Sequence, residues 1–329
     1  MPQLGGGSCL ALLQCDLECG VRILLVGCSG FVGRALVPLL LQRGHQLTLV
    51  SRSPQPLPAL QQEQLTRLQA NPADPASWGQ PALQQALAAA EAVVNLAGEP
   101  IAEKRWTPAH LQLLQDSRIL TTRALVQAMA ALPAGQGPTV LLNGSAIGYY
   151  GTSTTASFTE ASPAGADVLG RLCQAWEAEA QAATARCRLV ILRIGIVLGG
   201  DGGALGKMLP VFRLGFGGPI GDGQQWMSWI SRHDLCQLIA QALEDPAYGG
   251  TYNAVAPEPC SMASFAAALG RCLGRPSLLP VPGPLLQLLL GDGAKLVLVG
   301  QRVLPERLQQ QGFTFRDGQL SAALAAATS

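Results

Sequence analysis

The sequence predicts an α/β protein built on a doubly wound parallel sheet. Apolar, β-rich runs alternate with helix-like segments through the first two-thirds of the chain. Right-handed crossovers between such strands give one sheet with helices on both faces. A glycine-rich turn, Gly27-Cys28-Ser29-Gly30-Phe31-Val32-Gly33, directly follows the first apolar run. A strand, a glycine turn and a helix in this order are typical of a sheet that binds a dinucleotide.

The glycine turn joins a predicted buried strand at 21–26 to a helix that Gly44 ends. The glycines let the backbone turn tightly and approach a pyrophosphate, and the helix N-terminus offers unpaired N–H groups and partial positive charge. The sequence therefore predicts a dinucleotide site here. Its expected contacts are Gly27, Ser29, Gly30, Phe31, Val32 and Gly33.

The end of the second predicted strand, 46–50, indicates which dinucleotide binds. An acid at this position would hold the ribose 2′-hydroxyl of NAD, but Ser51 and Arg52 stand there instead. A guanidinium suits a 2′-phosphate, and no carboxylate is present to repel one. We therefore expect NADP(H), with a solvated loop arginine as the alternative.

Composition limits the partners that the chain can have. The 329 residues carry a net charge of +1 and only 13% charged residues, so no electrostatic surface for nucleic acid or an anionic membrane is expected. No apolar run approaches the ~20 residues of a membrane span. Nine cysteines without a C-x-x-C pair and three histidines favour reduced thiols and no metal site. We expect a cytoplasmic protein that acts on a small molecule, and the oligomeric state stays open.

Residues 1–20 are unusual ahead of a first sheet strand. They hold glycines, three cysteines and the acids Asp16 and Glu18. A secretory signal would have basic residues before its apolar stretch and few acids. We expect a disordered extension, or a start assigned too early with Val21 as the true initiator.

The later sheet elements follow in order. A third strand ends at 71–74, a fourth runs over 92–98, a helix covers 117–131, and further strands are expected at 139–145 and 189–194. The fourth strand ends in small residues that let a cofactor ribose lie against the backbone at the carboxyl edge of the sheet. These expected contacts are Leu96, Ala97 and Gly98.

The composition changes after Gly199. A glycine-rich stretch surrounds a short helix at 205–214, a strand is expected at 226–230, and Asp234 is the expected N-cap of the next helix. Trp226, Trp229 and Phe216 are more typical of a core than of a ligand platform. We therefore divide the chain into a dinucleotide-binding domain, 21–200, and a substrate-side lobe with a C-terminal closing domain, 201–329.

The G-x-x-G-x-x-G spacing resembles the short-chain dehydrogenase/reductase superfamily, and Gly30-Phe31-Val32-Gly33 resembles its extended, epimerase-like branch. As a set, further motifs resemble the atypical group called epimerase family protein SDR39U1, which has bacterial and chloroplast relatives. These motifs are 95–101, 104–106, 117–118, 144–151, 176–177, 193–199, 217–221, 228–230 and 300–305.

This resemblance implies a Rossmann core that binds NADP(H), an unassigned physiological substrate, and a bacterial cytosol or plastid stroma as location. It adds Asp74 as an adenine contact, and Glu99, Arg118 and Val197 as further cofactor contacts. Glu99 is alternatively a second acid, or an anchor for Arg105 or Arg118.

The chain departs from the superfamily at its proton relay. Active extended reductases carry Tyr-x-x-x-Lys on one helix face, where the lysine lowers the pKa of the tyrosine. A glutamate commonly follows that tyrosine by eight residues, and counting back from Glu177 puts Leu169 and Cys173 at the two positions. Neither side chain can do this chemistry.

Three hydroxyls remain as candidates for catalysis. Ser145 stands where the family serine would bond a substrate carbonyl, and Tyr149 and Tyr150 are the hydroxyl acids placed to replace the missing tyrosine. The alternative is that both aromatic rings only line the pocket.

Two classes of function therefore stay open. The first is an NADP(H)-dependent oxidoreductase or epimerase-like enzyme acting on an unknown small molecule. The second is a catalytically weak or inactive NADPH-binding sensor or scaffold. A sugar-nucleotide epimerase is weaker than either, because epimerisation usually needs the missing tyrosine.

Overall fold

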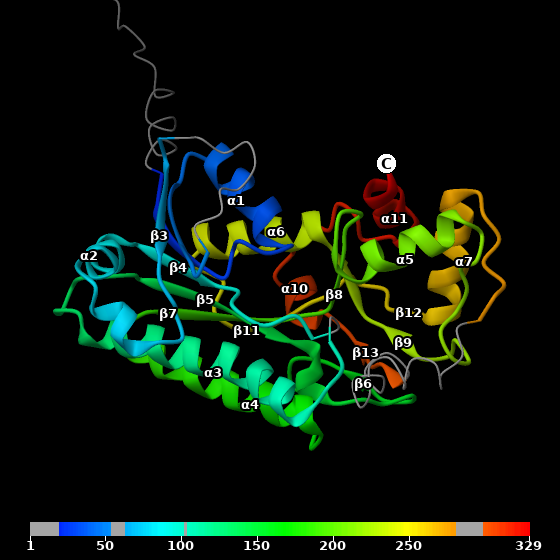
Figure 1. The fold of residues 1–329 in the computed structure, drawn as a ribbon, viewed down its shortest axis with the longest axis horizontal. Helices are drawn as coiled ribbons and strands as arrows, with labels where there is room; N and C mark the ends of the chain where they lie inside the picture. The colour runs from blue at the N-terminus through cyan, green and yellow to red at the C-terminus, as the bar shows by residue number, and fades with distance from the viewer. Residues whose placement is uncertain (1–19, 54–62, 102–103, 281–298) are drawn as a thin grey trace, which may run out of the picture.

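A seven-stranded parallel sheet forms the centre of the molecule (Figure 1). The structure is a computed structural model, and it describes residues 20–53, 63–101, 104–280 and 299–329. The expectations for the N-terminal extension therefore fall almost wholly outside the described residues. The strand order is β11-β7-β5-β4-β1-β2-β3. The strands are β1 (Arg22–Val26), β2 (Gln46–Ser51), β3 (Leu65–Gln69), β4 (Ala92–Asn95), β5 (Val140–Ala146), β7 (Arg188–Ile194) and β11 (Gly250–Ala254).

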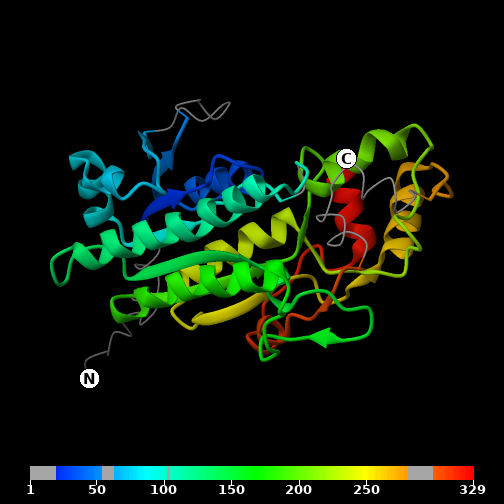
Figure 2. The same ribbon diagram turned by 60° about the horizontal axis from the view of Figure 1, so that its bottom comes forward.

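Helices cover both faces of this sheet, which confirms the doubly wound α/β prediction (Figures 1 and 2). One face packs against α1 (Gly33–Gln42) and α6 (Arg232–Glu244). The other face packs against α2 (Pro81–Ala89), α3 (Pro108–Ala131) and α4 (Val168–Gln181). Because both faces are covered, the inner strands are continuous apolar runs rather than alternating ones.

Three short 3₁₀ helices lie among these elements. They are η1 (Pro75–Gly79), η2 (Ile147–Tyr150) and η3 (Ala182–Ala185). The second of them, η2, continues from the carboxyl end of β5 and carries both candidate tyrosines.

A second, smaller core lies beyond one end of the sheet. It is enclosed by α5 (Gly203–Arg213), α7 (Met262–Leu273) and α11 (Leu320–Thr328) (Figure 1). Short strands pair beside it: β8 (Ile196–Leu198) with β10 (Trp229–Ser231), and β9 (Trp226–Met227) with β12 (Cys260–Ser261). At the seam with the sheet, β13 (Arg302–Val303) pairs with β6 (Ser157–Phe158), and α10 (Glu306–Gln310) follows.

Two elements from beyond residue 200 return to the sheet. The strand β11 pairs with β7 along its whole length, and α6 packs beside α1. The sequence analysis predicted neither of these contacts. The division at residue 200 between a dinucleotide-binding domain and a substrate-side lobe stays a prediction. The expected strand at 226–230 is in fact two short strands with different partners.

The predicted N-cap of α6 was wrong. Ser231 caps this helix, since its hydroxyl accepts from the Asp234 N–H at 2.9 Å. The Asp234 carboxylate, only 1% exposed, instead accepts the N–H groups of Arg316 and Asp317, each at 3.0 Å. A buried acid thereby joins the sheet helix to the C-terminal segment.

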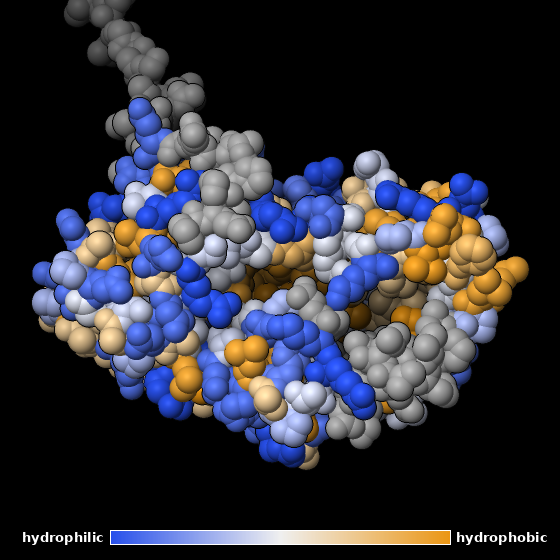
Figure 3. Space-filling model, viewed as in Figure 1, coloured by the Kyte–Doolittle hydropathy of each residue, from blue (hydrophilic) through white to orange (hydrophobic). Residues whose placement is uncertain are grey.

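The three aromatic residues expected in the core have different surroundings. Trp229 is fully buried and Trp226 is half-buried, but Phe216 is 61% exposed, so its expected core position was wrong. Apolar side chains gather at the outer end of the smaller region, over α5 and α7 (Figure 3). Within the described ranges, no helix is long and apolar enough to cross a membrane, and no metal-binding group of His, Cys, Asp and Glu is found.

Candidate functional site

The glycine turn leaves an open approach between two crowded glycines. Gly27 has φ +75°, and a Cβ there would collide with the Ala97 backbone at the end of β4. A Cβ on Gly33 would collide with the Cys28 carbonyl. At Gly30, however, the nearest heavy atom to an added Cβ is 3.9 Å away, and the residue is exposed. The turn therefore presents bare backbone where a pyrophosphate can approach the start of α1, and these residues fit a dinucleotide.

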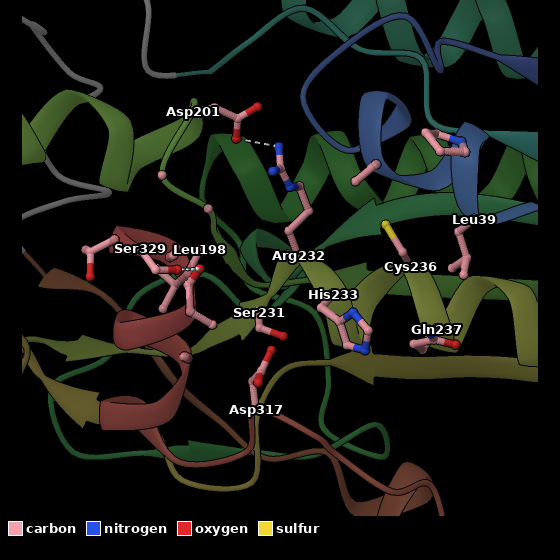
Figure 4. Close-up of a pocket in the computed structure, with 18 of the residues that line it drawn as sticks. Leu39, Leu198, Asp201, Ser231, Arg232, His233, Cys236, Gln237, Asp317 and Ser329 are labelled. Atoms are coloured by element: carbon pink, nitrogen blue, oxygen red, sulfur yellow. Dashed lines mark hydrogen bonds and ion pairs between the residues drawn. The ribbon is translucent and has the colours of Figure 1, made fainter. Parts of the chain in front are cut away.

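The loop between β8 and α5 covers one side of this turn. A Cβ on Gly199 or Gly202 would come within 2.8 or 2.7 Å of the Phe31 ring. The other neighbour of that ring is the Arg232 guanidinium, 4.6 Å from the ring centroid. Arg232 pairs with Asp201 at 2.6 Å, which fixes the loop beside the turn (Figure 4). The half-buried Phe31 ring thus packs between this loop and Arg232, and its contact with a cofactor stays a prediction.

Ser51 and Arg52 lie together at the end of β2, the position predicted to select the 2′-phosphate. The Ser51 hydroxyl accepts from the Ser53 N–H at 3.3 Å, and the Arg52 carbonyl accepts from Gln69 Nε2 at 3.3 Å. The Arg52 side chain is exposed, and its guanidinium makes no ion pair with any residue that the structure describes. No acid among the described residues neutralises this cation.

Asp74 lies beyond the third strand and caps η1. Its Oδ1 accepts from the Ala76 N–H at 3.0 Å, and the residue is exposed. The predicted adenine contact therefore has a local structural role as well.

Arg118, a predicted cofactor contact, holds the loop after β4. Its guanidinium donates to the carbonyls of Glu99 at 2.9 Å and Leu114 at 3.0 Å, and the residue is 8% exposed. Burial lowers the pKa of Arg118. A Cβ on Gly98 would lie 2.9 Å from Arg118 Cζ, so the loop backbone rests on the arginine. The Glu99 carboxylate pairs with Lys104 at 3.3 Å.

The remaining predicted cofactor contacts lie after β4, within β8 and at the start of α1. Leu96 is half-buried directly after β4, and Ala97 is buried. Val32 is half-buried at the start of α1. Val197 is half-buried in β8, paired with Ile230.

Ser145 belongs to a buried hydrogen-bonded network at the end of β5. Its Oγ donates to Glu177 Oε1 at 2.6 Å. Arg193 binds the same carboxylate through Nε at 2.9 Å and Nη2 at 2.8 Å. Arg193 Nη1 also donates to the Tyr150 hydroxyl at 2.9 Å, and that hydroxyl donates to Asn253 Oδ1 at 2.6 Å. We call these five residues the Arg193 network.

The Arg193 network occupies two of the three predicted catalytic hydroxyls. Ser145 has one hydroxyl proton, and Glu177 accepts it, while Tyr150 is 3% exposed and uses its hydroxyl both as donor and as acceptor. Burial raises the pKa of Tyr150 to about 12, despite the opposing charge of Arg193. Burial alone would lower the pKa of Arg193, but Glu177 outweighs it and raises that pKa.

Tyr149 is the predicted hydroxyl that no described residue binds. Its ring lies on the Arg193 guanidinium, 3.3 Å from Cζ to the ring centroid, and meets the Tyr150 ring edge-on at 5.3 Å. The residue is half-buried, and no hydrogen bond joins its hydroxyl to the described part of the protein. This phenol can reach a bound molecule.

The two positions counted back from Glu177 carry apolar packing. Leu169 is 8% exposed, and a Cβ on Gly148 would approach its Cβ to 3.2 Å. Cys173 is 2% exposed in a cluster with Leu114 and Trp176, and burial raises the pKa of its thiol to about 12. A neutral, buried thiol cannot replace a lysine.

A separate groove of about 810 Å³ lies on the outer side of α1 and α6, against α11. Leu39, His233, Gln237 and Asp317 line it (Figure 4). It contains none of the predicted site residues, so it is distinct from the glycine turn.

Sequence reasoning missed the roles of Glu177 and Arg232 in the site, and it named Arg193 only as a charge that could lower the pKa of the catalytic tyrosine. Glu177 was used only to locate the positions where a tyrosine and a lysine were expected. The contact of Arg232 with Phe31 joins residues about two hundred positions apart in the chain. Arg193 gave a usable signal, because a charged residue in the middle of a buried strand is rarely without a partner.

Comparisons with known proteins show the family of this chain. The model of the NAD dependent epimerase/dehydratase family matches residues 23–255, and a domain of unknown function (DUF1731) matches 281–327. The chloroplastic epimerase family protein SDR39U1 homolog of Arabidopsis thaliana is 41% identical over 311 residues, which cover 93% of this chain and 86% of that protein. Epimerase family protein SDR39U1 of Bos taurus is 40% identical, covering 92% and 98%.

A solved structure is similar over nearly the same length. The crystal structure of human epimerase family protein SDR39U1 (isoform2) with NADPH superposes with a TM-score of 0.83. It is 37% identical in sequence, and the match covers 93% of this chain and 98% of that one.

Proposed function

This chain belongs to the NAD-dependent epimerase/dehydratase family, and we propose that it binds NADP(H) and acts as an oxidoreductase on a small molecule. The observation that carries the proposal is the open backbone at Gly30 together with the exposed Arg52 at the end of β2, which forms no ion pair within the described residues. The presence of NADPH in the human relative supports it. When bound, the cofactor supplies or accepts a hydride. We further propose a cytoplasmic location.

The residues would hold NADP(H) as follows. The turn from Gly27 to Gly33 receives the pyrophosphate at the start of α1, and Ser51 and Arg52 receive the 2′-phosphate. Asp74 lies at the adenine end, and Leu96, Ala97 and Val197 line the strand ends toward the nicotinamide.

We assign the proton transfer to Tyr149. Of the three predicted hydroxyls, it is the one that no residue in the described ranges holds. Ser145 and Tyr150 become positioning residues, because they fix Glu177 and Arg193 beneath the Tyr149 ring. A proton then passes from the Tyr149 hydroxyl to the substrate oxygen during reduction.

A second candidate function is an NADPH-binding sensor or scaffold with little turnover. The observation that favours it is the apolar packing of Leu169 and Cys173, together with the single proton of Ser145 already donated to Glu177. Neither feature interferes with cofactor binding.

Calorimetric titration with NADPH and NADH tests the cofactor assignment. We expect NADPH to bind about tenfold to a hundredfold more tightly, because a charge-assisted bond contributes roughly 1.5–3 kcal/mol. Arg52→Ala should remove most of this preference, whereas Arg271→Ala, an exposed arginine on α7, should leave it unchanged. Equal affinity of the wild type for both cofactors would contradict the assignment.

A turnover assay separates the two candidate functions. The purified chain is incubated with NADPH and a panel of aldehydes and ketones, and loss of NADPH absorbance is followed. Steady consumption with any member supports the oxidoreductase. Tight NADPH binding without consumption across the panel supports the sensor.

A further inference from the structure

The segment 300–303 is held rigidly at the seam between the sheet and the smaller region. Gly300 has φ +64° and lies so close to β9 that a Cβ would collide with the Trp226 carbonyl. Ser228 Oγ accepts from the Val303 N–H at 2.8 Å and donates to the Gln301 carbonyl at 3.0 Å. Arg302, between them, therefore has a fixed backbone.

Neighbouring side chains in this segment point to the sheet, and Arg302 points away from it. Gln301 is 3% exposed and donates through Nε2 to the Ile147 carbonyl at 3.1 Å. Val303 is fully buried in a cluster with Ile147 and Tyr150. Because side chains alternate along a strand, Arg302 faces the opposite side, where its guanidinium lies 4.8 Å from the Trp226 ring centroid.

This arrangement joins the backbone that carries Arg302 to the segment of the proposed proton donor, while the Arg302 side chain lies on the other side of its strand, against Trp226. Ile147 begins η2, and Tyr149, the proposed proton donor, is on the same 3₁₀ helix. The Gln301–Ile147 bond thus ties the Arg302 strand directly to the segment that carries Tyr149.

Arg302 differs from the structural arginines of this chain. Arg118, Arg188 and Arg307 each donate to two or more main-chain carbonyls. Arg302 is only half-buried, yet its Nε is inaccessible to solvent and has no hydrogen-bond partner. None of the ion pairs among the described residues includes it.

The geometry points to Arg302 as the residue that recognises an anionic group, a carboxylate or a phosphate, on the small-molecule substrate. With one face of the guanidinium on Trp226 and Nε closed to solvent, its two Nη groups remain for a planar, two-point contact with an anion. That the anionic group belongs to a substrate rests on the proposed function, but binding of an anion is measurable without turnover.

The outer groove of Figure 4 offers a weaker anion site. Its Arg232 is already neutralised by Asp201 at 2.6 Å. Arg302 has no such acid among the residues described.

The test is an NMR titration of the full-length protein, free and saturated with NADPH, with benzoate, inorganic phosphate and neutral benzamide. The arginine Nε–H signals are observed, and the Arg302 signal is assigned by its loss in Arg302→Lys. We expect benzoate or phosphate, but not benzamide, to shift this signal. The anion that binds more tightly identifies a carboxylate or a phosphate as the substrate group.

Variants make the result specific. Arg302→Gln should weaken anion binding about tenfold or more, and Arg302→Lys should weaken it less, since a lysine keeps the charge but not the two-point geometry. Arg271→Gln, an exposed charge in the same region, is the matched control and should bind as the wild type does. Unchanged melting temperatures show that the variants fold.

Two outcomes overturn the inference: an Arg302→Gln affinity within twofold of the wild type, or no shift of the Arg302 signal by either anion at millimolar concentration. NADPH affinity measured on the same samples reports separately on the proposed function. A protein that binds the anion but not NADPH contradicts only the proposed function. One that binds NADPH but no anion contradicts only the role of Arg302.

Discussion

Tyr149 and Tyr150 are adjacent in the chain, yet their hydroxyls have opposite surroundings. The Tyr150 hydroxyl bonds Arg193 and Asn253, whereas the Tyr149 hydroxyl is open and only its ring contacts Arg193. The sequence predicted both as candidates and could not rank them. The partners that decide between them come from β7 and β11, which are distant in sequence.

Phenylalanine substitutions separate these two roles. Tyr149→Phe should lower turnover about 10²–10⁴-fold, the usual contribution of general acid catalysis, with NADPH affinity kept. Tyr150→Phe removes the partner of two buried atoms, Arg193 Nη1 and Asn253 Oδ1, so it should lower the free energy of unfolding by about 1–3 kcal/mol. Steady-state kinetics and urea unfolding measure the two effects. A larger loss of turnover in Tyr150→Phe, with stability unchanged, would reverse the assignment.

The raised pKa of Tyr150 also predicts a pH dependence. Its folded pKa of about 12 lies above the unfolded value of 10.0. The folded state therefore holds this proton more tightly, and the resulting stabilisation, complete below pH ~10, is lost as the pH rises through the folded pKa. Unfolding free energies of the wild type and of Tyr150→Phe, measured at pH values between the unfolded and the folded pKa, test this loss of stabilisation. A difference between the two proteins that does not shrink as the pH rises would contradict this reading.

At the scale of elements, local patterns predicted most of the sheet. The apolar runs that became β1, β2, β5 and β7 were placed to within a residue or two, because each is a continuous buried strand. The N-cap of α6 failed because Ser231 and Asp234 are both good caps, three positions apart. Only the packing of Asp234 against residues 316–317 shows which one begins the helix.

The glycine turn gives a prediction with an internal control. Gly30→Ala should fold normally, since nothing lies closer than 3.9 Å to its Cβ, but should lose NADPH affinity because the methyl occupies the pyrophosphate approach. Gly27→Ala should instead destabilise the fold by about 1–3 kcal/mol, because its φ is positive and its Cβ meets Ala97. Gly79→Ala, with no neighbour within 4 Å, should change neither property. Thermal unfolding and calorimetry check all three, and wild-type NADPH affinity in Gly30→Ala would refute the turn as the site.

At the scale of the whole molecule, the chain leaves the sheet and returns to it. After β8 it builds part of the smaller core, then supplies α6 and β11 to the sheet, and its last segment pairs β13 with β6 (Figure 1). The contacts that shape the site follow from these returns: Arg232 against Phe31, Asn253 on Tyr150, and Gln301 on Ile147. Sequence patterns report local preference, and they contain no information on pairings across such separations.

A crystal structure of this protein with NADPH tests the central claim most directly. We expect the pyrophosphate against the backbone of residues 30–33 and the 2′-phosphate about 2.7–2.9 Å from the Arg52 guanidinium, as charge-assisted bonds require. Of all protein hydroxyls, that of Tyr149 should lie nearest to nicotinamide C4. The space between the two should admit a substrate atom at the near-attack distance of about 3–3.5 Å. A cofactor bound in the groove outside α1, or a 2′-phosphate without contact to Arg52, would contradict the account.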